Sequence, residues 1–392
     1  MKTIKLPHSI NQSLNEFSVF SCSKYNNLKI GNDNLGRNKL IVSDIWSFWD
    51  YIIKRFAEKN HKKEEDKNIL FSFLEQARHF YISGESSPVK SQALLYYYSF
   101  LNLSKITYLI NKNFNNLSSK KYTHGISEVY KKIFKDCEIS IKTSDAGDIQ
   151  IAHEMLMLFD SNIAPQPNTN KHNFNIREIL SHCTGIHRSY SEIYNKAESF
   201  IKVVDYSLFK RGKDLYFVGY LDNPKPISDK IPMLRAAGYS IDEFKNDRFT
   251  LNENNLVFDE LDFFKDGFYF FDKIRMPHGY SHDKIPKIYY EGLSNKIRGR
   301  GVWYLVGNNG YTLYLSTSNN LRYRYSQESI IYIVMFFLGS ITRYNPYLFD
   351  TLFSDKEQWL ISEFLMTQPK QFLYLLTSHV LGQPVFKAHV NF

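Results

Sequence analysis

Apolar side chains recur at helical spacing along much of the chain. Ser43 or Asp44 can cap a first helix, because a side-chain oxygen there accepts hydrogen bonds from the amides of the first turn. The charged stretch 61–67 predicts a solvated turn, and the periodicity of residues 68–82 predicts a second amphipathic helix. The apolar positions of the first helix lie close to one face: Ile45, Trp46, Trp49, Ile52 and Ile53.

The residues Ser86-Ser87-Pro88 predict the start of a third helix. A hydroxyl there provides an N-cap, and a proline suits the first helical position, where its missing N–H is not needed. The run 89–110 that follows is apolar on almost every side. A helix of this kind lies in the centre of its domain and is covered by other elements.

Shorter elements are predicted after this helix. Residues 128–135 favour a short amphipathic helix, and the alternation over 138–151 favours a strand or hairpin. The stretch 161–173 is rich in Pro and Asn and typical of a linker, so we place the main boundary of the chain there. Residues 174–200 are again helical, with an interruption near Thr184-Gly185.

The chain changes character over residues 201–325. Short β-branched and aromatic runs alternate with turns there, and 303–316 predicts a hairpin that closes over Asn308-Asn309-Gly310. From Ser326 onwards the pattern returns to helix, with expected helices over 328–342, 355–365 and 370–381.

These patterns predict an α+β fold that is predominantly helical, with a helical core and a strand-containing antiparallel lobe. A length of 392 residues agrees with more than one lobe, because a single core rarely grows beyond about 300 residues. The expected parts are an N-terminal segment with one helix (1–66), the first part of the helical core (67–165), a helical connection (174–200), the mixed lobe (201–325) and C-terminal helices that pack on the core (326–392).

Composition narrows the class of protein. A hydrophobic content of 43% is typical of a folded chain, and 3 scattered cysteines favour a reducing compartment over a disulfide framework. The N-terminus lacks the apolar run of a secretory signal. The longest apolar run, 330–338, has about half of the roughly 20 residues that a membrane span needs. We therefore expect a cytoplasmic protein without a membrane partner.

The formal net charge of +9 is compatible with a polyanionic partner such as RNA or DNA. The alternative is an ordinary solvated surface, because the charge excess is spread along the chain. Lys and Asn are also abundant throughout, as AT-rich coding DNA produces. Charge alone does not decide between the two interpretations.

Four segments resemble a known protein family. They are SSPVKSQALLYYYSFLNLSK at 86–105, THGI at 123–126, FNIREIL at 174–180 and ITRYNP at 341–346. In order and spacing they resemble the YaaC-like family of bacterial proteins, from about Leu70 to the C-terminus. The resemblance implies a helical cytoplasmic protein and leaves its activity open.

Arg177 and His182 have the Arg-x4-His spacing of HEPN-type ribonucleases. In those helical proteins, which are usually dimers, the His acts as general base on a ribose 2'-hydroxyl and the Arg steadies the phosphate, without a metal. The alternative is a helix with an ordinary surface Arg and a partly buried His, because one such spacing arises readily by chance. Glu178 also stands where those enzymes more often carry a neutral polar residue.

The polar residues of the family-like segments are candidates for an anion site: Lys105, His124, Arg343 and Asn345. A lysine in an otherwise apolar helix either reaches water or meets a partner, because burial without one is costly. With an Arg and a His beside it, the group would bind phosphate or carboxylate. The alternative is that Lys105 lies at the exposed end of its helix and that Arg343 stabilises a helix C-terminus through the macrodipole.

Cations and aromatic residues alternate in two stretches of the mixed lobe. Such alternation suits single-stranded nucleic acid, in which phosphates meet Arg and bases stack on rings. It equally suits the edges of a sheet. The candidate nucleic-acid-binding residues are Lys296, Arg298, Arg300, Arg322 and Arg324.

Histidines offer a weaker case for zinc. His182, Cys183 and His187 are close in sequence, and His278 and His282 form an i, i+4 pair, although that pair lies in a turn-like sequence. We therefore expect satisfied or exposed histidines, no metal and no cofactor. The chain has neither a glycine-rich phosphate loop nor a Gly-x-Ser-x-Gly elbow.

Two hypotheses of function follow. In the first, the chain acts on nucleic acid, as a HEPN-like ribonuclease or as an effector in bacterial conflict and defence. In the second, it is a non-catalytic module that binds an anionic small molecule or a protein partner through the region of Lys105, His124 and Arg343. A second copy of the chain is one such partner.

Overall fold

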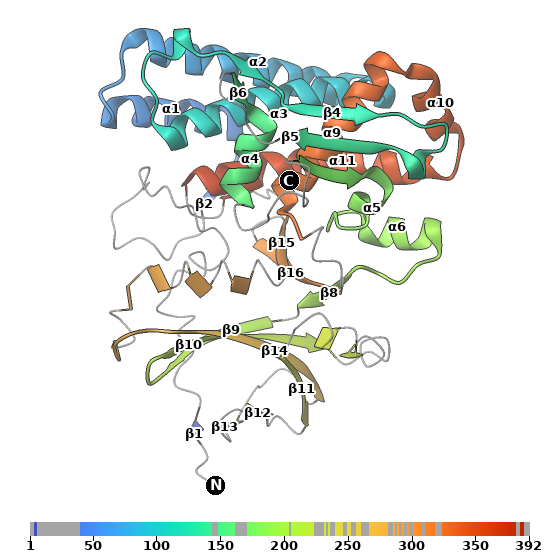
Figure 1. Cartoon of the computed structure of the whole chain (residues 1–392). Helices are drawn as coiled ribbons and strands as arrows, with labels where there is room; N and C mark the ends of the chain where they lie inside the picture. The colour runs from blue at the N-terminus through green and yellow to red at the C-terminus, as the bar shows by residue number, and fades with distance from the viewer. Residues whose placement is uncertain are drawn as a thin grey trace. The chain divides into compact units, whose positions relative to one another are not determined.

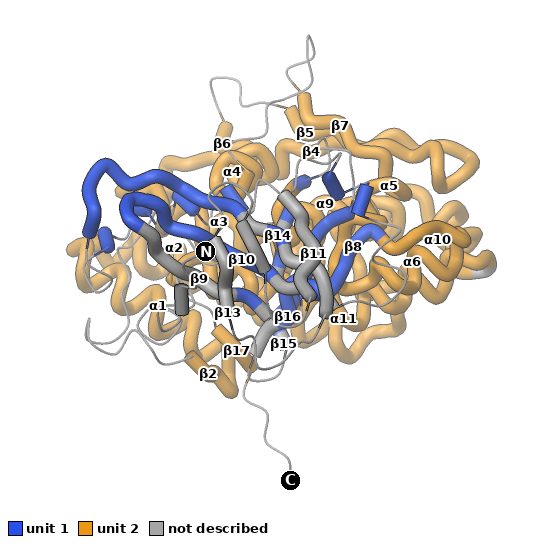
Figure 2. Tube along the Cα trace, turned by 90° about the horizontal axis from the view of Figure 1, so that it is seen from below, with its two compact units in different colours: residues 1–22, 31–39, 199–324 blue, residues 23–30, 40–198, 325–392 orange. Residues whose placement is uncertain are grey.

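The chain folds into two compact units, which Figure 2 colours separately. The helical unit holds residues 40–198 and 325–387, and the strand unit holds residues 199–324 together with the strand β1 (Ile4–Lys5). A computed structural model describes residues 4–5, 40–142, 148–160, 171–203, 205–222, 231–232, 234–235, 240–245, 249–251, 256–259, 266–280, 285–286, 288–289, 292–293, 296–297, 301–307, 310–317, 324–381 and 385–387.

Helix α3 (Val89–Lys112) forms the centre of the helical unit (Figure 1). It is apolar on most sides, which is why other helices cover it. Phe100 is fully buried, and its ring stacks on that of Phe372 with the ring centres 4.0 Å apart. The helices that pack against α3 are α2 (Glu64–Ser86), α4 (Ile151–Phe159), α9 (Gln327–Tyr344) and α11 (Glu357–Leu381).

Glycine permits the close approach of α9 to α3. A Cβ at Gly339 would lie 3.0 Å from the Cβ of Tyr97 and 3.2 Å from the carbonyl oxygen of Ala93. Both distances are tighter than ordinary van der Waals contact, so a larger residue would push the two helices apart. The other helical elements of the unit are α1 (Ile45–Lys59), η4 (Leu117–Ser119), η5 (Phe134–Asp136), α5 (Ile176–Leu180), α6 (His187–Tyr194) and α10 (Pro346–Ser354).

Small sheets complete the helical unit. One is antiparallel and has the order β4 (Ile126–Val129), β5 (Glu138–Lys142) and β7 (Lys171–Asn175). The other two are parallel pairs: β3 (Tyr122–Thr123) with β6 (Ile149–Gln150), and β17 (Val385–Lys387) with β2 (Leu40–Val42).

The strand unit is built mainly from antiparallel strands around an apolar core that includes Leu215, Phe217 and Leu315. Its larger sheet has the order β11 (Ser240–Lys245), β14 (Asp266–Arg275), β10 (Asp214–Asp222) and β9 (Asp205–Arg211). A second sheet has the order β15 (Val302–Gly307), β16 (Gly310–Ser316) and β8 (Phe200–Val203). In the third, β13 (Leu256–Asp259) lies between β1 and β12 (Phe249–Leu251).

The predominantly helical α+β fold is confirmed. Asp44 caps α1 by accepting from the amides of Trp46 and Ser47, and Ser326 caps α9 by accepting from the amide of Ser329. The hairpin expected over 303–316 is present as β15 and β16, and its turn residues Asn308 and Asn309 lie outside the described residues.

The prediction of a helix over 128–135 is wrong. Its first residues belong to β4, where Ile126 pairs with Ile141 and Val129 pairs with Glu138. A segment this short has too few backbone hydrogen bonds to form a helix by itself, so the neighbouring strand decides its conformation.

The helix boundaries differ from the predicted ones at two prolines. Pro88 is the N-cap of α3 and makes no side-chain cap, while the Ser87 hydroxyl donates to the Ser83 carbonyl at the end of α2. Pro369 lies inside α11, so the two helices expected over 355–365 and 370–381 are one. Pro369 is buried, and packing holds the helix together across the hydrogen bond that proline cannot make.

The boundary expected over 161–173 lies mostly outside the described residues, and Lys171–Asn175 form a strand. Within the described part of the chain, no helix combines the length and apolar composition of a membrane span.

Candidate functional site

Three of the four family-like segments contact helix α9 or belong to it. The hydroxyl of Tyr98 on α3 accepts a hydrogen bond of 2.7 Å from Nη1 of Arg343 at the end of α9. The ring of His124, in the turn between β3 and β4, has its centre 5.7 Å from that of Phe336 on α9. We call the surface around these contacts the motif face, whose polar members are Tyr98, Lys105, His124, Glu128, Tyr130, Ser340 and Arg343.

Arg343 is an exposed cation that pairs with no carboxylate among the described residues. Its guanidinium carbon lies 4.9 Å from the ring centre of Tyr344, and its hydrogen bond to Tyr98 goes to a neutral hydroxyl. A guanidinium presents five N–H donors in a planar fork, so most of them are free to bind another group. Two tyrosines therefore order the side chain without neutralising its charge.

Lys105 is a half-buried cation on the same side of α3 as Tyr98. Its Nζ donates to Asn102 Oδ1 at 3.1 Å and lies 4.9 Å from the ring centre of Phe73 and 6.0 Å from that of Tyr122. Burial lowers the pKa of Lys105, and no carboxylate offsets that effect. The seven residues from Tyr98 to Lys105 span roughly 10 Å along α3, so the two cations mark the ends of an elongated face.

A tight turn holds His124. Gly125 has a φ of 68°, and a Cβ there would lie 2.7 Å from the Cβ of Gln150, so the turn requires glycine. The Ile126 amide donates to His124 Nδ1 at 3.4 Å, and the Ala152 amide donates to the His124 carbonyl at 3.1 Å. The imidazole is exposed, and its Nε2 has no hydrogen-bond partner among the described residues.

Glu128 is the negatively charged member of the motif face. Its Oε1 accepts from the hydroxyl of Ser340 at 2.5 Å and from that of Tyr130 at 3.2 Å. Burial raises the pKa of Tyr130 well above its usual value, and the nearby charge of Glu128 adds to that effect. Glu128 Oε2 accepts no hydrogen bond from the described residues, which leaves an acceptor for a ligand.

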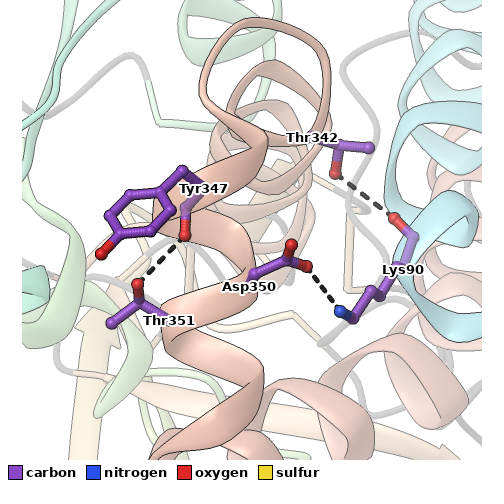
Figure 3. Close-up of polar contacts among 5 residues, drawn as sticks. All are labelled: Lys90, Thr342, Tyr347, Asp350 and Thr351. Carbon is purple, nitrogen blue, oxygen red and sulfur yellow. Dashed lines mark hydrogen bonds and ion pairs between the residues drawn. The ribbon is translucent and has the colours of Figure 1, made fainter.

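The corner between α9 and α10 is fixed by contacts of its own (Figure 3). Lys90 Nζ on α3 lies 2.5 Å from Asp350 Oδ1 on α10, and the Thr342 hydroxyl donates to the Lys90 carbonyl at 3.4 Å. Asn345 caps α10 by accepting from the Leu348 amide at 3.3 Å. Asn345, a predicted anion ligand, is therefore engaged as a helix cap.

The predicted catalytic pair, Arg177 and His182, is less accessible to solvent than the motif face. His182 has 5% of its surface exposed, and its carbonyl accepts from Gln327 Nε2 at 2.9 Å. The guanidinium carbon of Arg177 lies 3.9 Å from the ring centre of Tyr194. A general base must reach the proton of its substrate, and a ring this buried offers a polynucleotide little access. The catalytic assignment stays a prediction.

The predicted nucleic-acid-binding stretches are only partly described. Lys296 Nζ lies 2.5 Å from Asp272 Oδ1 and donates to the Lys273 carbonyl at 2.8 Å. Arg324 has 6% of its surface exposed. Neither is an open cation, and the other three candidates, Arg298, Arg300 and Arg322, lie outside the described residues.

The potential zinc ligands do not assemble. Among the described residues, no group of three or more His, Cys, Asp or Glu side chains could hold a metal ion. Burial raises the pKa of Cys183 to about 12, and His187 Nδ1 lies 2.7 Å from the Thr184 carbonyl oxygen. His282 lies outside the described residues.

Sequence reasoning missed three members of the motif face: Glu128, Tyr130 and Ser340. A carboxylate and a tyrosine in a predicted surface helix carry no signal of their own. Ser340 stands three residues before Arg343, so it shares that end of α9, and this spacing is the signal that the sequence contained.

A family model described as YaaC-like Protein matches residues 45–380. The matched region includes all four family-like segments and every polar member of the motif face. Neither the curated proteins nor the solved structures contain a match to the chain.

Proposed function

The chain belongs to the YaaC-like family, and from this premise we propose that it is a non-catalytic binding module whose ligand carries a phosphate or carboxylate group. Arg343 carries the proposal. It is an exposed guanidinium that two tyrosines hold in place and that no described carboxylate neutralises. Charge-assisted bonds from such a fork to an oxyanion are among the stronger hydrogen bonds in proteins.

Lys105 supports the same proposal. A half-buried ammonium group that has no carboxylate partner among the described residues is destabilised by desolvation in the free protein. An anionic ligand would supply the missing opposite charge. The charge of Lys105 would therefore contribute more to binding than to folding.

The hydroxyl groups of the motif face favour binding over catalysis. Ser340 donates to Glu128, and the Tyr130 hydroxyl lies 2.9 Å from Ser340 Oγ and 3.2 Å from Glu128 Oε1, so it can donate to either. Burial keeps the tyrosine protonated by raising its pKa. A hydroxyl that is protonated at neutral pH and already donates to a carboxylate serves to position that carboxylate.

Thermal unfolding of the full chain tests the proposal. Inorganic phosphate, pyrophosphate and citrate are added at constant ionic strength. At about 100 times the Kd, a ligand should raise the Tm of the wild type by several degrees. In Arg343→Ala the rise should disappear, while the Tm without ligand should change little because the side chain is exposed.

Arg55→Ala is the matched control. Arg55 is partly exposed on α1 and also donates to a tyrosine hydroxyl, that of Tyr51, at 2.9 Å, but it lies outside the family-like segments. Its removal should leave the effect of the anions intact. Equal loss in both variants, or no stabilisation of the wild type by any of these anions, would refute the proposal.

The nucleic-acid hypothesis stays a separate prediction, including its ribonuclease and defence versions. It is tested by incubating single-stranded RNA with the wild type and with His182→Ala. Cleavage by the wild type alone would support Arg177 and His182 as a catalytic pair. Cleavage by both variants or by neither would remove that version.

The predicted cytoplasmic location and the prediction of a protein partner or second copy also stay open to test. Light scattering of the purified chain across a range of concentrations measures self-association directly.

A further inference from the structure

We infer that the ligand of the motif face is a nucleoside phosphate, an inference that rests on the proposed anion-binding function. A site for a bare anion needs donors only, whereas this face has a guanidinium next to an exposed tyrosine and a carboxylate oxygen that accepts from no described residue.

Glu128 is held by a residue of the same end of α9 that carries Arg343. Ser340, which donates to Glu128, precedes Arg343 by three residues, a rise of roughly 4.5 Å along α9. A carboxylate beside an anion site opposes a bare phosphate, because like charges repel. It favours a ligand that also donates hydrogen bonds, and Glu128 Oε2 is an available acceptor for a ribose hydroxyl.

Two tyrosines that follow Arg343 in the chain are largely exposed to solvent. Tyr344 has 63% of its surface exposed and Tyr347 has 82%, and the Tyr344 ring already lies against the guanidinium. Exposed rings of this kind offer a stacking surface, and stacking of a base on an aromatic side chain contributes about 1–3 kcal/mol in proteins that bind single strands. The exposed imidazole of His124 provides a further ring on the same face.

These features assign a place to each part of a mononucleotide. The phosphate binds the free donors of Arg343, a ribose hydroxyl donates to Glu128 Oε2, and the base stacks on Tyr344. A polynucleotide fits less well, because binding a long strand needs a track of cations. Among the described residues, the motif face contains one arginine, Arg343, and one lysine, Lys105, which do not form such a track.

Calorimetric titration of the full chain with AMP, ribose 5-phosphate, adenosine and inorganic phosphate tests the inference. AMP should bind most tightly, at least about tenfold more tightly than inorganic phosphate, because it makes all three contacts. Tyr344→Ala should weaken AMP but not ribose 5-phosphate. Glu128→Gln should weaken both of these ligands and leave inorganic phosphate unchanged or slightly tighter, because repulsion is removed.

Both variants are suited to the test. Tyr344 is exposed, and Gln at position 128 still accepts from Ser340 and Tyr130, so circular dichroism should show a native fold. Equal affinity for AMP and inorganic phosphate would overturn the nucleotide inference and leave the anion site standing. Failure of every phosphate compound to bind would refute both. Tight binding of adenosine without help from a phosphate would also overturn the inference.

Discussion

The two ends of helix α9 differ in where their polar groups find partners. At the N-terminal end, buried Asp160 accepts from the amide of Ser326 at 2.7 Å and from the hydroxyls of Ser326 and Ser329. Gln327, also buried, accepts from Thr184 and donates to the His182 carbonyl. These polar groups are partnered within the protein.

At the C-terminal end, Arg343 and Glu128 are ordered by neutral hydroxyls and do not neutralise other charges. Buried polar groups without partners would oppose folding, so the N-terminal network is explained by stability alone. Exposed charges face no such requirement. The difference teaches that, along one helix, the polar groups that stability does not explain are the ones to test for ligand binding.

The largest expected effect is at the N-terminal end of α9. Asp160→Ala would leave an amide and two hydroxyls without their acceptor in a buried site and should lower the free energy of unfolding by about 3 kcal/mol or more. Asp44→Ala is the control, because Asp44 makes similar cap bonds to Trp46 and Ser47 at an exposed position. It should cost about 1 kcal/mol. Urea unfolding followed by circular dichroism measures both, and equal costs would contradict the comparison.

A pH effect is expected at the same end. His172 lies on β7 with Nδ1 2.8 Å from the hydroxyl of Tyr325, and burial lowers its pKa to about 4. Between pH 6.5 and 4 the unfolded chain binds a proton at His172 and the folded chain does not, so stability falls as pH falls through this window. The loss should be about 3 kcal/mol.

Unfolding measured at several pH values in the wild type and in His172→Asn tests this effect. Asn can keep the hydrogen bond to Tyr325 without titrating, so the variant should show a flatter dependence, whatever its absolute stability. His153 and His187 have lowered pKa values as well, so part of the slope should persist. An unchanged slope would exclude His172 as a source.

A smaller effect is expected in the middle of α9. Gly339→Ala should cost about 1–2 kcal/mol, because overpacking against α3 outweighs the gain of about 1 kcal/mol in helix propensity. Thermal unfolding measures the change. Thr342→Ala removes a partly buried hydroxyl that bonds to the Leu338 carbonyl at 2.7 Å within α9 and to the Lys90 carbonyl at 3.4 Å. It should change stability by less than about 0.5 kcal/mol, because the main bond is a local one within the helix. A stabilised Gly339→Ala protein would mean that α9 and α3 pack less closely than described.

The smallest effect on stability is expected at the motif face. Lys105→Met keeps the apolar stem and removes a half-buried charge, so the free energy of unfolding should stay within about 1 kcal/mol or rise. Stabilisation by anions should nevertheless weaken several-fold. Lys112→Met, at the exposed end of the same helix, should change neither property. A large loss of stability in Lys105→Met would show that this charge supports the fold.

The strongest sequence predictions concern elements whose local pattern agrees with their environment. Residues 89–110 are apolar on almost all sides, and α3 lies at the centre of the helical unit. The cap at Asp44 and the hairpin of β15 and β16 follow from residues that are adjacent in the chain. Local chemistry determines such features because the groups that interact are neighbours.

The predictions that failed depended on distant residues. The helix predicted over 128–135 does not form, because its first residues pair with β5. Pro369 does not interrupt α11. In both cases tertiary contacts outweigh local preference, because the segment is short or buried. The sequence also indicated that Lys105, His124 and Arg343 carry the family resemblance. It did not place Glu128 beside them.

By itself, then, the sequence determined the helical class, the central helix and the candidate cations, since periodicity and residue type are local properties. Only the tertiary structure decided which of the described cations pair with a carboxylate, as Lys296 does with Asp272. The partners of a charge come from other segments of the chain, such as Tyr98 for Arg343, and folding alone brings them into contact.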